Sequence, residues 1–374
     1  MTWSLKSLDE IGFVRRGRSR HRPRDAEHLY GGPYPFIQTG DVKHANLYIT
    51  EYSQTYSDAG LTQSKLWKEG TLCITIAANI AETAILGIDA CFPDSIIGFI
   101  PDSDKADVRF IKYLFDALLQ RRYQQFTQGA AQDNLSQEKL LSLKFPVPDI
   151  KTQKRISDVL ATYDILIENN RRRIQLLEQA ARLLYKEWFV HLRFPGHEHV
   201  NIKDGMPEGW ERKKLGDIAQ LNYGKGLKEE ERIPGPYAVY GSSGKIGTHE
   251  KPLVQGPGII VGRKGNVGSV FWSEEDFYPI DTVYFIGNDK SGLFLYYSLL
   301  HTSFISTDVA VPGLNRDLAH SRQLLIAEPK LKSLFEEMVV PIHKQIYILQ
   351  KYNTSLAKAR DLLLPRLMNG EIAV

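Results

Sequence analysis

The chain has 374 residues, of which 43% are hydrophobic and 24% charged, and its formal net charge is +3. This composition is typical of a globular protein long enough for two domains, and the small net charge does not by itself indicate nucleic-acid binding. We expect no membrane segment and no signal peptide, because no apolar run approaches the ~18–20 residues of a membrane span. Two cysteines without metal-site spacing, Cys73 and Cys91, favour a reducing, cytoplasmic location.

Residues 1–150 are predicted to form a first domain of short strands, glycine turns and short helices. The segment "RRGRSRHRPR" from Arg15 to Arg24 holds six arginines, and it is either a solvated loop or a phosphate-binding segment. "TLCITIA" from Thr71 is typical of a buried strand, and "DVRFIKYLFDALL" from Asp107 of a helix. "PDSDK" from Pro101 superficially resembles a nuclease motif, but its loop context favours a surface turn.

Residues 151–192 are predicted to form a long helix. Apolar residues recur there at alternating steps of four and three, which is the a/d pattern of a coiled coil. The pattern comprises Ile156, Leu160, Tyr163, Ile167, Ile174, Leu177, Ala181, Leu184 and Trp188, with Asn170 in its one gap. At about 1.5 Å per residue the stripe is about 48 Å long, too long to be buried within one small domain.

Residues 193–330 are predicted to contain a linker and a second domain. The linker begins "RFPGHEHVN" and is rich in Gly, Pro and polar residues. Its histidines could suggest a metal site, but no carboxylate or cysteine pattern stands at ligand spacing from them, which favours a plain linker. In the domain, "GIIVG" from Gly258 is typical of a strand and "LFLYYSLL" from Leu293 of a helix.

Residues 331–374 are predicted to form a second long helix. Shifting the first stripe by 179 residues gives Phe335, Val339, Ile342, Ile346, Leu349, Leu356, Leu363 and Leu367, with Asn353 and Arg360 as polar interruptions. Pro341 and Pro365 weaken the pattern towards its ends, since proline caps or kinks helices.

The second half of the chain repeats the first. "AAQDNLSQEKLLSLKFPVP" from Ala130 resembles "AVPGLNRDLAHSRQLLIAEP" from Ala310, and five further matches follow the same order, one of which aligns Asn79 with Asn266. The sequence therefore predicts two similar mixed α/β domains, an α+β class overall, joined by two long helices and related by a pseudo-two-fold axis.

Such an axis makes the two helices antiparallel. Setting Asn170 opposite Asn353 pairs the apolar residues along both stripes and leaves Arg360 opposite Tyr163, where its alkyl stem would lie on the ring. We expect the two asparagines either to hydrogen-bond and fix the helix register or to face water at the edge of the seam. Two related domains on a rigid spacer suit DNA with two separated half-sites.

In the order of its motifs the chain resembles the specificity subunit of a Type I restriction-modification system. The resemblance rests on "AQDNLSQEKLLSLKFPVP" followed by "KTQKRISDVLATYDILIENN", on "MPEGWERKKLGDIAQLNYGKG", on "YGSSGKIG" with "GRKGNVGSV", and on the ending "LLLPRLMNGEI". "KTQKRI" and "KLKSLF" depart from the Pro-rich "EQ" turn frequent in that family.

The resemblance implies a non-catalytic subunit whose two target-recognition domains each read one half of a bipartite double-stranded DNA sequence. It also implies partners: two methyltransferase subunits, which use S-adenosylmethionine, and motor and nuclease subunits. The chain itself has no methyltransferase motif and no P-loop, so we expect no catalytic residue, cofactor or metal in it.

Candidate DNA contacts are basic and amide side chains beside glycines, because Lys and Arg bind phosphates while Arg, Asn and Gln read base edges. In the first domain they are Arg15, Arg16, Arg18, Arg20, Arg22, Arg24, Gln38, Thr39, Lys43 and His44. In the second they are Asn222, Tyr223, Lys225, Ser242, Ser243, Lys245, Arg263, Lys264 and Asn266. Each also has a structural alternative, since "GRKGN" is equally a hairpin turn.

Two alternatives remain open at this point. An enzyme in its own right would need the missing motifs, and a scaffold with two protein-binding heads would show no salt-sensitive DNA binding. We expect the methyltransferase partner to bind the outer faces of the long helices, although ordinary solvent exposure explains the charged residues there equally well. These residues are Arg171, Arg172, Arg173, Glu178, Lys351 and Lys358.

Overall fold

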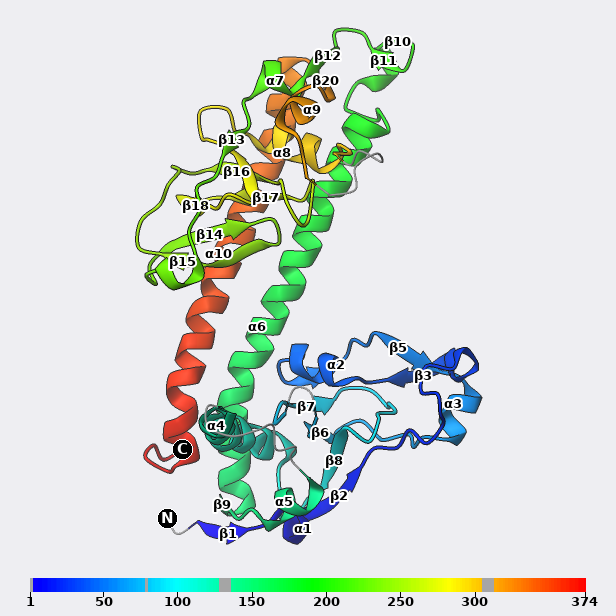
Figure 1. The fold of residues 1–374 in the computed structure, drawn as a ribbon, viewed down its shortest axis with the longest axis vertical. Coiled ribbons are helices and arrows are strands. Elements are labelled where there is room, and N and C mark those ends of the chain that lie inside the picture. Colours follow the sequence, from blue (N-terminus) through cyan, green and yellow to red (C-terminus); the bar gives the residue numbers. More distant parts are fainter. Residues whose placement is uncertain (1–2, 78–79, 128–135, 305–312) are drawn as a thin grey trace. The chain divides into compact units, whose positions relative to one another are not determined.

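The computed structural model describes residues 3–77, 80–127, 136–304 and 313–374 (Figure 1). The chain forms two compact units, one of residues Met1–Arg172 with Lys351–Val374 and one of residues Arg173–Gln350. Each unit consists of a mixed α/β head and parts of two long helices, α6 (Ile150–Tyr185) and α10 (Pro329–Met368). The long helices begin within two residues of the predicted positions.

The first head is built on a five-stranded sheet in the order β2-β8-β6-β7-β4, in which only the β4–β7 pair is parallel. Its central strand, β6, is buried at every residue, as its continuous apolar run predicts. A separate β3–β5 pair carries a small second core. The elements are β1 (Ser4–Lys6), α1 (Leu8–Ile11), β2 (Gly12–Arg16), η1 (Glu27–Leu29), β3 (Tyr30–Phe36), α2 (Thr39–His44), β4 (Tyr48–Ile49), β5 (Gln54–Tyr56), α3 (Asp58–Thr62), β6 (Leu72–Thr75), β7 (Thr83–Leu86), β8 (Ile96–Pro101), α4 (Val108–Thr127), α5 (Gln137–Ser142) and β9 (Phe145–Val147).

The second head contains a four-stranded antiparallel sheet in the order β13-β19-β16-β17 and a three-stranded sheet in the order β15-β14-β18. The predicted linker holds a short β10–β11 hairpin. The elements are η2 (Lys186–Val190), η3 (His197–His199), β10 (Ile202–Lys203), β11 (Met206–Pro207), β12 (Glu211–Lys214), α7 (Leu215–Ile218), β13 (Asn222–Tyr223), η4 (Glu229–Glu231), β14 (Tyr237–Gly241), β15 (Gly244–His249), β16 (Gly258–Gly262), β17 (Val270–Ser273), β18 (Phe277–Pro279), β19 (Val283–Ile286), α8 (Leu293–Leu300), α9 (Arg316–His320) and β20 (Gln323–Ile326).

The two heads share one topology, which confirms the predicted repeat. Strands β2, β8, β6 and β7 stand in the same spatial order as β13, β19, β16 and β17. In each head the first strand also pairs antiparallel with the strand that precedes the long helix, β1 with β9 and β12 with β20. Helix α8 takes the place of the longer α4.

The passage written twice builds the entry into each long helix. Residues 130–135 and 310–312 lie outside the described residues, but the remainder forms a short capped helix and a strand in both copies. The hydroxyl of Ser136 accepts the N–H of Lys139 at the start of α5, and Asn315 Oδ1 accepts the N–H groups of Asp317 and Leu318 at the start of α9. The strand that follows each cap leads directly into α6 or α10.

Within the first unit, α6 and the end of α10 run antiparallel with the predicted register. Asn170 Nδ2 donates to Asn353 Oδ1 at 2.9 Å, and Asn353 Nδ2 donates to the carbonyl of Ile167 at 3.3 Å. Asn170 is only 9% exposed, so the alternative in which both side chains face water is wrong. Every residue of the predicted first stripe is buried or half-buried.

One seam contact was not predicted. The guanidinium of Arg360 forms an ion pair with Asp164, which is 1% exposed although it lies outside the a/d stripe. That the alkyl stem of Arg360 lies on the Tyr163 ring stays a prediction. A charged group in a buried seam gains more from a carboxylate than from a ring, because the carboxylate compensates its lost hydration.

Helix α10 runs through both prolines without a break. Pro341 is exposed and Pro365 half-buried, and neither ends the helix as a proline often does. In the second unit, Phe335 and Val339 of α10 pack with Ala181, Tyr185 and Trp188 in one core, so the stripe is buried there too.

Candidate nucleic-acid interface

The arginine run of the first head divides into structural and solvent-facing members. Arg24 bonds both carboxylate oxygens of Asp94 at 2.9 and 3.0 Å, and Arg16 Nε donates to the backbone carbonyl of Asp94 at 2.9 Å. Arg18 donates to the carbonyl of Ser64, and Arg22 donates to the carbonyl of Ser19 at 2.9 Å. Arg16, Arg18 and Arg24 therefore tie this part of the chain onto the head, whereas Arg22 bonds the carbonyls of Ser19 and His21 within the same segment.

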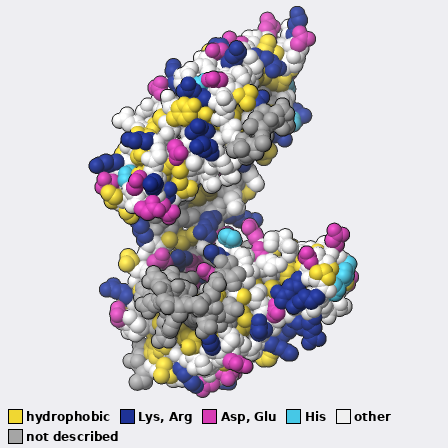
Figure 2. Space-filling view, in the orientation of Figure 1, with side chains coloured by type: hydrophobic (Ala, Val, Ile, Leu, Met, Phe, Trp, Pro, Cys, Tyr) yellow, Lys and Arg dark blue, Asp and Glu magenta, His cyan; other side chains and the backbone are white. Residues whose placement is uncertain are grey.

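Arg15 and Arg20 remain exposed, and among the described residues their side chains have no hydrogen-bond or ion-pair partner. In Figure 2 Lys and Arg side chains gather on the first head over the segment that follows β2. The run thus provides both the fold of this segment and free cationic charge at its surface.

Sequence reasoning missed Lys65, which joins this surface. Its Nζ lies 3.8 Å from the centroid of the Trp67 ring and 5.3 Å from that of Phe13, which is 49% exposed. Burial lowers the pKa of Lys65, and the positive charges of Arg15 and Arg18 lower the same pKa further. Because Lys65 lies near two other positive charges, a bound phosphate would relieve the repulsion among them. Only the fold reveals it, because Lys65 is far from the arginine run in sequence.

Four further predicted residues belong to helix α2 and its N-terminus. Gln38 precedes the helix; its N–H donates to Asp41 Oδ2 at 2.7 Å and its side chain donates to Gln54 Oε1 at 2.9 Å. Thr39 is half-buried, whereas Lys43 and His44 at the C-terminal end are exposed. These residues thus come from a separate element of the head.

In the second head, predicted residues converge around Tyr223 of β13. The guanidinium carbon of Arg263 lies 5.0 Å from the centroid of the Tyr223 ring, and that of Arg316 lies 5.1 Å from it. Arg263 also donates to the carbonyl of Asp281 at 3.1 Å, which fixes the direction of its guanidinium. Tyr223 is 49% exposed, so this arrangement presents two cations and an aromatic face to solvent. Arg316 was missed because it lies in the most diverged copy of the repeat.

A second group joins the β14–β15 hairpin turn to the loop after β16. Asn266 Nδ2 donates to Ser243 Oγ at 3.3 Å, and Ser269 Oγ donates to the carbonyl of Ser242 at 2.7 Å. Gly265 has φ +77°, which accounts for glycine in the turn "GRKGN". Asn266 therefore has a structural role in joining two turns, which is the alternative given for "GRKGN". Its counterpart in the first copy, Asn79, lies outside the described residues.

The lysines around these groups are exposed. They are Lys225, Lys245 and Lys264, and Asn222 beside Tyr223 is exposed as well. The second head thus places all nine predicted residues on β13, the β14–β15 turn and the loops that adjoin them. Their charge and hydrogen-bonding groups suit phosphates and base edges.

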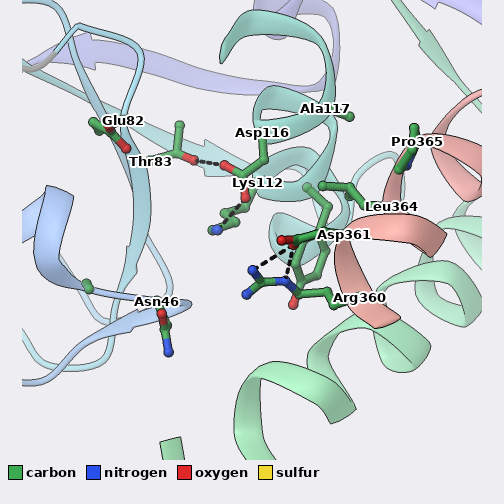
Figure 3. A pocket seen from close by; sticks show the side chains of 12 residues that line it. Asn46, Glu82, Thr83, Lys112, Asp116, Ala117, Arg360, Asp361, Leu364 and Pro365 are labelled. Carbon is green, nitrogen blue, oxygen red and sulfur yellow. Dashed lines mark hydrogen bonds and ion pairs between the residues drawn. The ribbon is translucent and has the colours of Figure 1, made fainter. Parts of the chain in front are cut away.

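A cavity of about 380 Å³ in the first unit separates the head from the end of α10 (Figure 3). Asp116 accepts from Thr83 Oγ1 at 2.8 Å and pairs with Lys112, while Arg360 pairs with Asp361 at 2.8 Å. Since these charged groups already compensate one another, we interpret the cavity as a packing gap between elements and not as a binding site.

"PDSDK" is a surface turn, as predicted, closed by a Lys105–Asp102 ion pair at 2.8 Å.

The part of the chain that the structure describes contains neither a metal cluster nor a membrane span. Within residues 3–77, 80–127, 136–304 and 313–374, no group of three or more His, Cys, Asp or Glu side chains is arranged to hold a metal ion. No helix in the same part of the chain is both long and apolar enough to cross a bilayer.

Comparisons with known proteins agree with this architecture. The family model described as Type I restriction modification DNA specificity domain matches residues 1–179 and 207–315. The Type I restriction enzyme MjaIX specificity subunit of Methanocaldococcus jannaschii is 25% identical over 411 residues, covering 100% of this chain and 94% of that protein. The Type I restriction enzyme HindI specificity subunit of Haemophilus influenzae is 22% identical, with 90% of this chain and 94% of that protein covered.

Among solved structures, a Type-I restriction-modification system S subunit from M. genitalium superposes with a TM-score of 0.63 at 17% identity, over 98% of this chain and 96% of that one. This likeness extends the shared fold over both heads and both long helices. Together with the family match over more than half of the sequence, it establishes that the chain belongs to the DNA specificity subunits of type I restriction-modification systems.

Proposed function

We propose that this subunit reads a bipartite double-stranded DNA target, one half-site with each head, and that the long helices set the distance between the half-sites. The observation that carries the proposal is the shared sheet order of two heads whose solvent-facing residues differ. Two heads with the same fold and different surfaces are expected if each head reads a different half-site.

The two surfaces differ in the chemistry they offer to DNA. The first head presents Arg15, Arg20 and Lys65, the last beside the exposed ring of Phe13, whereas the second presents Arg263 and Arg316 around Tyr223. Phosphate contacts supply affinity and orientation, and an arginine in a fixed direction is suited to the O6 and N7 atoms of guanine.

We further propose that the outer faces of the long helices dock methyltransferase subunits, two per chain, which supply S-adenosylmethionine chemistry, and that motor and nuclease subunits join them. Several large apolar side chains face solvent on these helices, an arrangement typical of protein-binding surfaces. They include Ile165, Leu166, Tyr352 and Leu362 in the first unit, and Leu176, Leu183, Met338 and Ile348 in the second. The exposed charges at Arg171, Arg172, Arg173, Lys351 and Lys358 would flank them, together with the half-buried Glu178.

Salt dependence of DNA binding tests the proposal. The chain, purified with its methyltransferase subunits, should bind duplex DNA with an affinity that falls roughly 10²–10³-fold between 50 and 200 mM salt, if about five phosphates are neutralised. Fluorescence anisotropy of a labelled duplex measures this. Binding that is absent, or insensitive to salt, would instead support a protein-binding scaffold.

A further inference from the structure

Three helices of the first unit meet at one buried carboxylate. Asp164 of α6 is 1% exposed, and its Oδ2 accepts the hydroxyl of Tyr113 on α4 at 2.6 Å. Its Oδ1 pairs with the guanidinium of Arg360 on α10. The head helix and both long helices are therefore joined through a single side chain.

A buried carboxylate in this position depends on its hydrogen-bond and ion-pair partners to replace its lost hydration. Burial removes its hydration, so loss of either contact leaves an uncompensated charge or lone pair in the interior. Burial lowers the pKa of Arg360, but the hydrogen bonds and charges of Asp164 and Asp361 together outweigh burial and hold that pKa above its usual value. The cluster thus tolerates little displacement of α4 relative to the long helices.

The second unit has the same contact at the repeat-equivalent position. Tyr297 of α8 occupies the place of Tyr113, since "FLYY" from Phe294 matches "FIKY" from Phe110. The Tyr297 hydroxyl lies 2.8 Å from Nε2 of His343, and His343 is the residue 179 positions after Asp164, the shift that relates the two long helices. A tyrosine from the head helix on a polar residue of the long helix is therefore a feature of both halves.

The chemistry of the two contacts differs. The residue 179 positions before Arg360 is Ala181, which is fully buried. The first contact is hence an ion pair with a tyrosine, and the second a tyrosine–histidine pair with no ionised group at the position equivalent to Arg360. The head-to-helix attachment has been kept through the duplication while its polar groups changed.

We propose that Tyr113, Asp164 and Arg360 are positioning residues that hold the first head in one orientation on the helix pair and thereby fix the number of base pairs between the two half-sites. This inference rests on the proposed bipartite reading. None of the three is among the candidate DNA contacts, so they would act on spacing without changing the bases read. A change of one base pair moves a half-site by about 3.4 Å and about one tenth of a helical turn, so a small rotation of a head is enough to alter the accepted spacing.

Mapping of methylated adenines in cells that carry the partner subunits tests the inference. Asp164→Asn, Arg360→Met and Tyr113→Phe should each raise, at least fivefold, the fraction of methylated sites whose spacer is one base pair longer or shorter, with both half-site sequences unchanged. Arg360→Lys, which keeps the charge, should restore most of the discrimination.

Matched controls change the same chemical groups away from the cluster. Glu168→Gln is an acid-to-amide change at an exposed position of α6, and Tyr52→Phe removes a hydroxyl from an exposed ring of the first head. Both should keep the wild-type spacer. If Asp164→Asn does not accumulate as a folded protein, Tyr113→Phe, which removes one oxygen atom, carries the test.

Variants that methylate as much DNA as wild type and still accept only one spacer would overturn the inference while leaving bipartite reading intact. If the wild-type protein itself directs no bipartite methylation, the proposed function fails and the inference fails with it.

Discussion

At the residue scale, Arg263 is the cation of the second head whose direction is best defined. Its guanidinium lies over Tyr223 and donates to the carbonyl of Asp281, so it is held before DNA arrives. A group held in this way loses little entropy on binding, which favours base reading over loose phosphate contact.

We therefore predict that Arg263→Ala weakens binding to the recognised sequence by about 1–3 kcal/mol and binding to unrelated DNA much less. Arg263→Lys should not rescue it, because a lysine cannot make the paired contacts of a guanidinium. Arg212→Ala, at an exposed arginine of β12, is the control. Equal losses on both kinds of DNA in competition binding assays would assign Arg263 to a phosphate instead.

His343 gives the second unit a defined response to acid. Burial lowers the pKa of His343 from 6.5 to about 4. Since the unfolded chain takes up a proton at pH values where the folded chain does not, the free energy of unfolding falls as the pH drops from 6.5 towards 4. It keeps its full value above pH 6.5.

Between pH 7.5 and pH 5, His343 should lower the free energy of unfolding of the wild-type protein by about 2 kcal/mol. In the His343→Gln variant the free energy of unfolding should therefore fall by about 2 kcal/mol less over the same interval. Urea unfolding followed by fluorescence at both pH values measures the difference. Parallel losses in the two proteins would show that His343 does not take part in the acid response.

Individual site residues were only partly predictable from sequence. The positions of Arg15, Tyr223 and Arg263 near the surface followed from charge beside glycine, but the roles of Arg16 and Arg24 did not. Both bond Asp94, 70 or more residues away, and only the fold brings such partners together. Lys65 was missed for the same reason.

At the element scale, the long helices were predictable in position and register because burial of an apolar stripe has a fixed period in any helix. Their ends were not, since α6 ends at Tyr185 and α10 at Met368, before the predicted residues 192 and 374. The four-and-three spacing identified apolar residues that are all buried or half-buried, and the Asn170–Asn353 contact followed from symmetry. The Arg360–Asp164 pair did not follow, because Asp164 lies beside the stripe and its burial depends on α4 of the head.

The asparagine pair should stabilise one register at a cost in stability. Replacing both Asn170 and Asn353 by leucine is predicted to raise the melting temperature, since two polar groups leave a buried seam, while cysteine cross-linking between the helices should become less selective. Asn170→Leu alone should destabilise the protein by about 1–3 kcal/mol, because Asn353 Oδ1 then loses its donor. A double variant with a lower melting temperature than wild type would contradict this account.

At the scale of the whole molecule, duplication explains both the sequence and the fold. One unit of head and helix was copied, the sheet order was kept, and the copies diverged in their exposed residues. The family could be inferred from sequence because motif order survives when identity does not. The bases that are read could not be inferred, since they depend on side-chain positions at base edges.

The central proposal is that two heads of the same fold with different surfaces read one target with two unlike halves. Methylated adenines mapped in the source cell, with and without this gene, test that claim most directly. The account predicts a bipartite motif with two different half-sites that disappears when the gene is deleted. A motif that persists without the gene, or one made of two identical inverted halves, would contradict it.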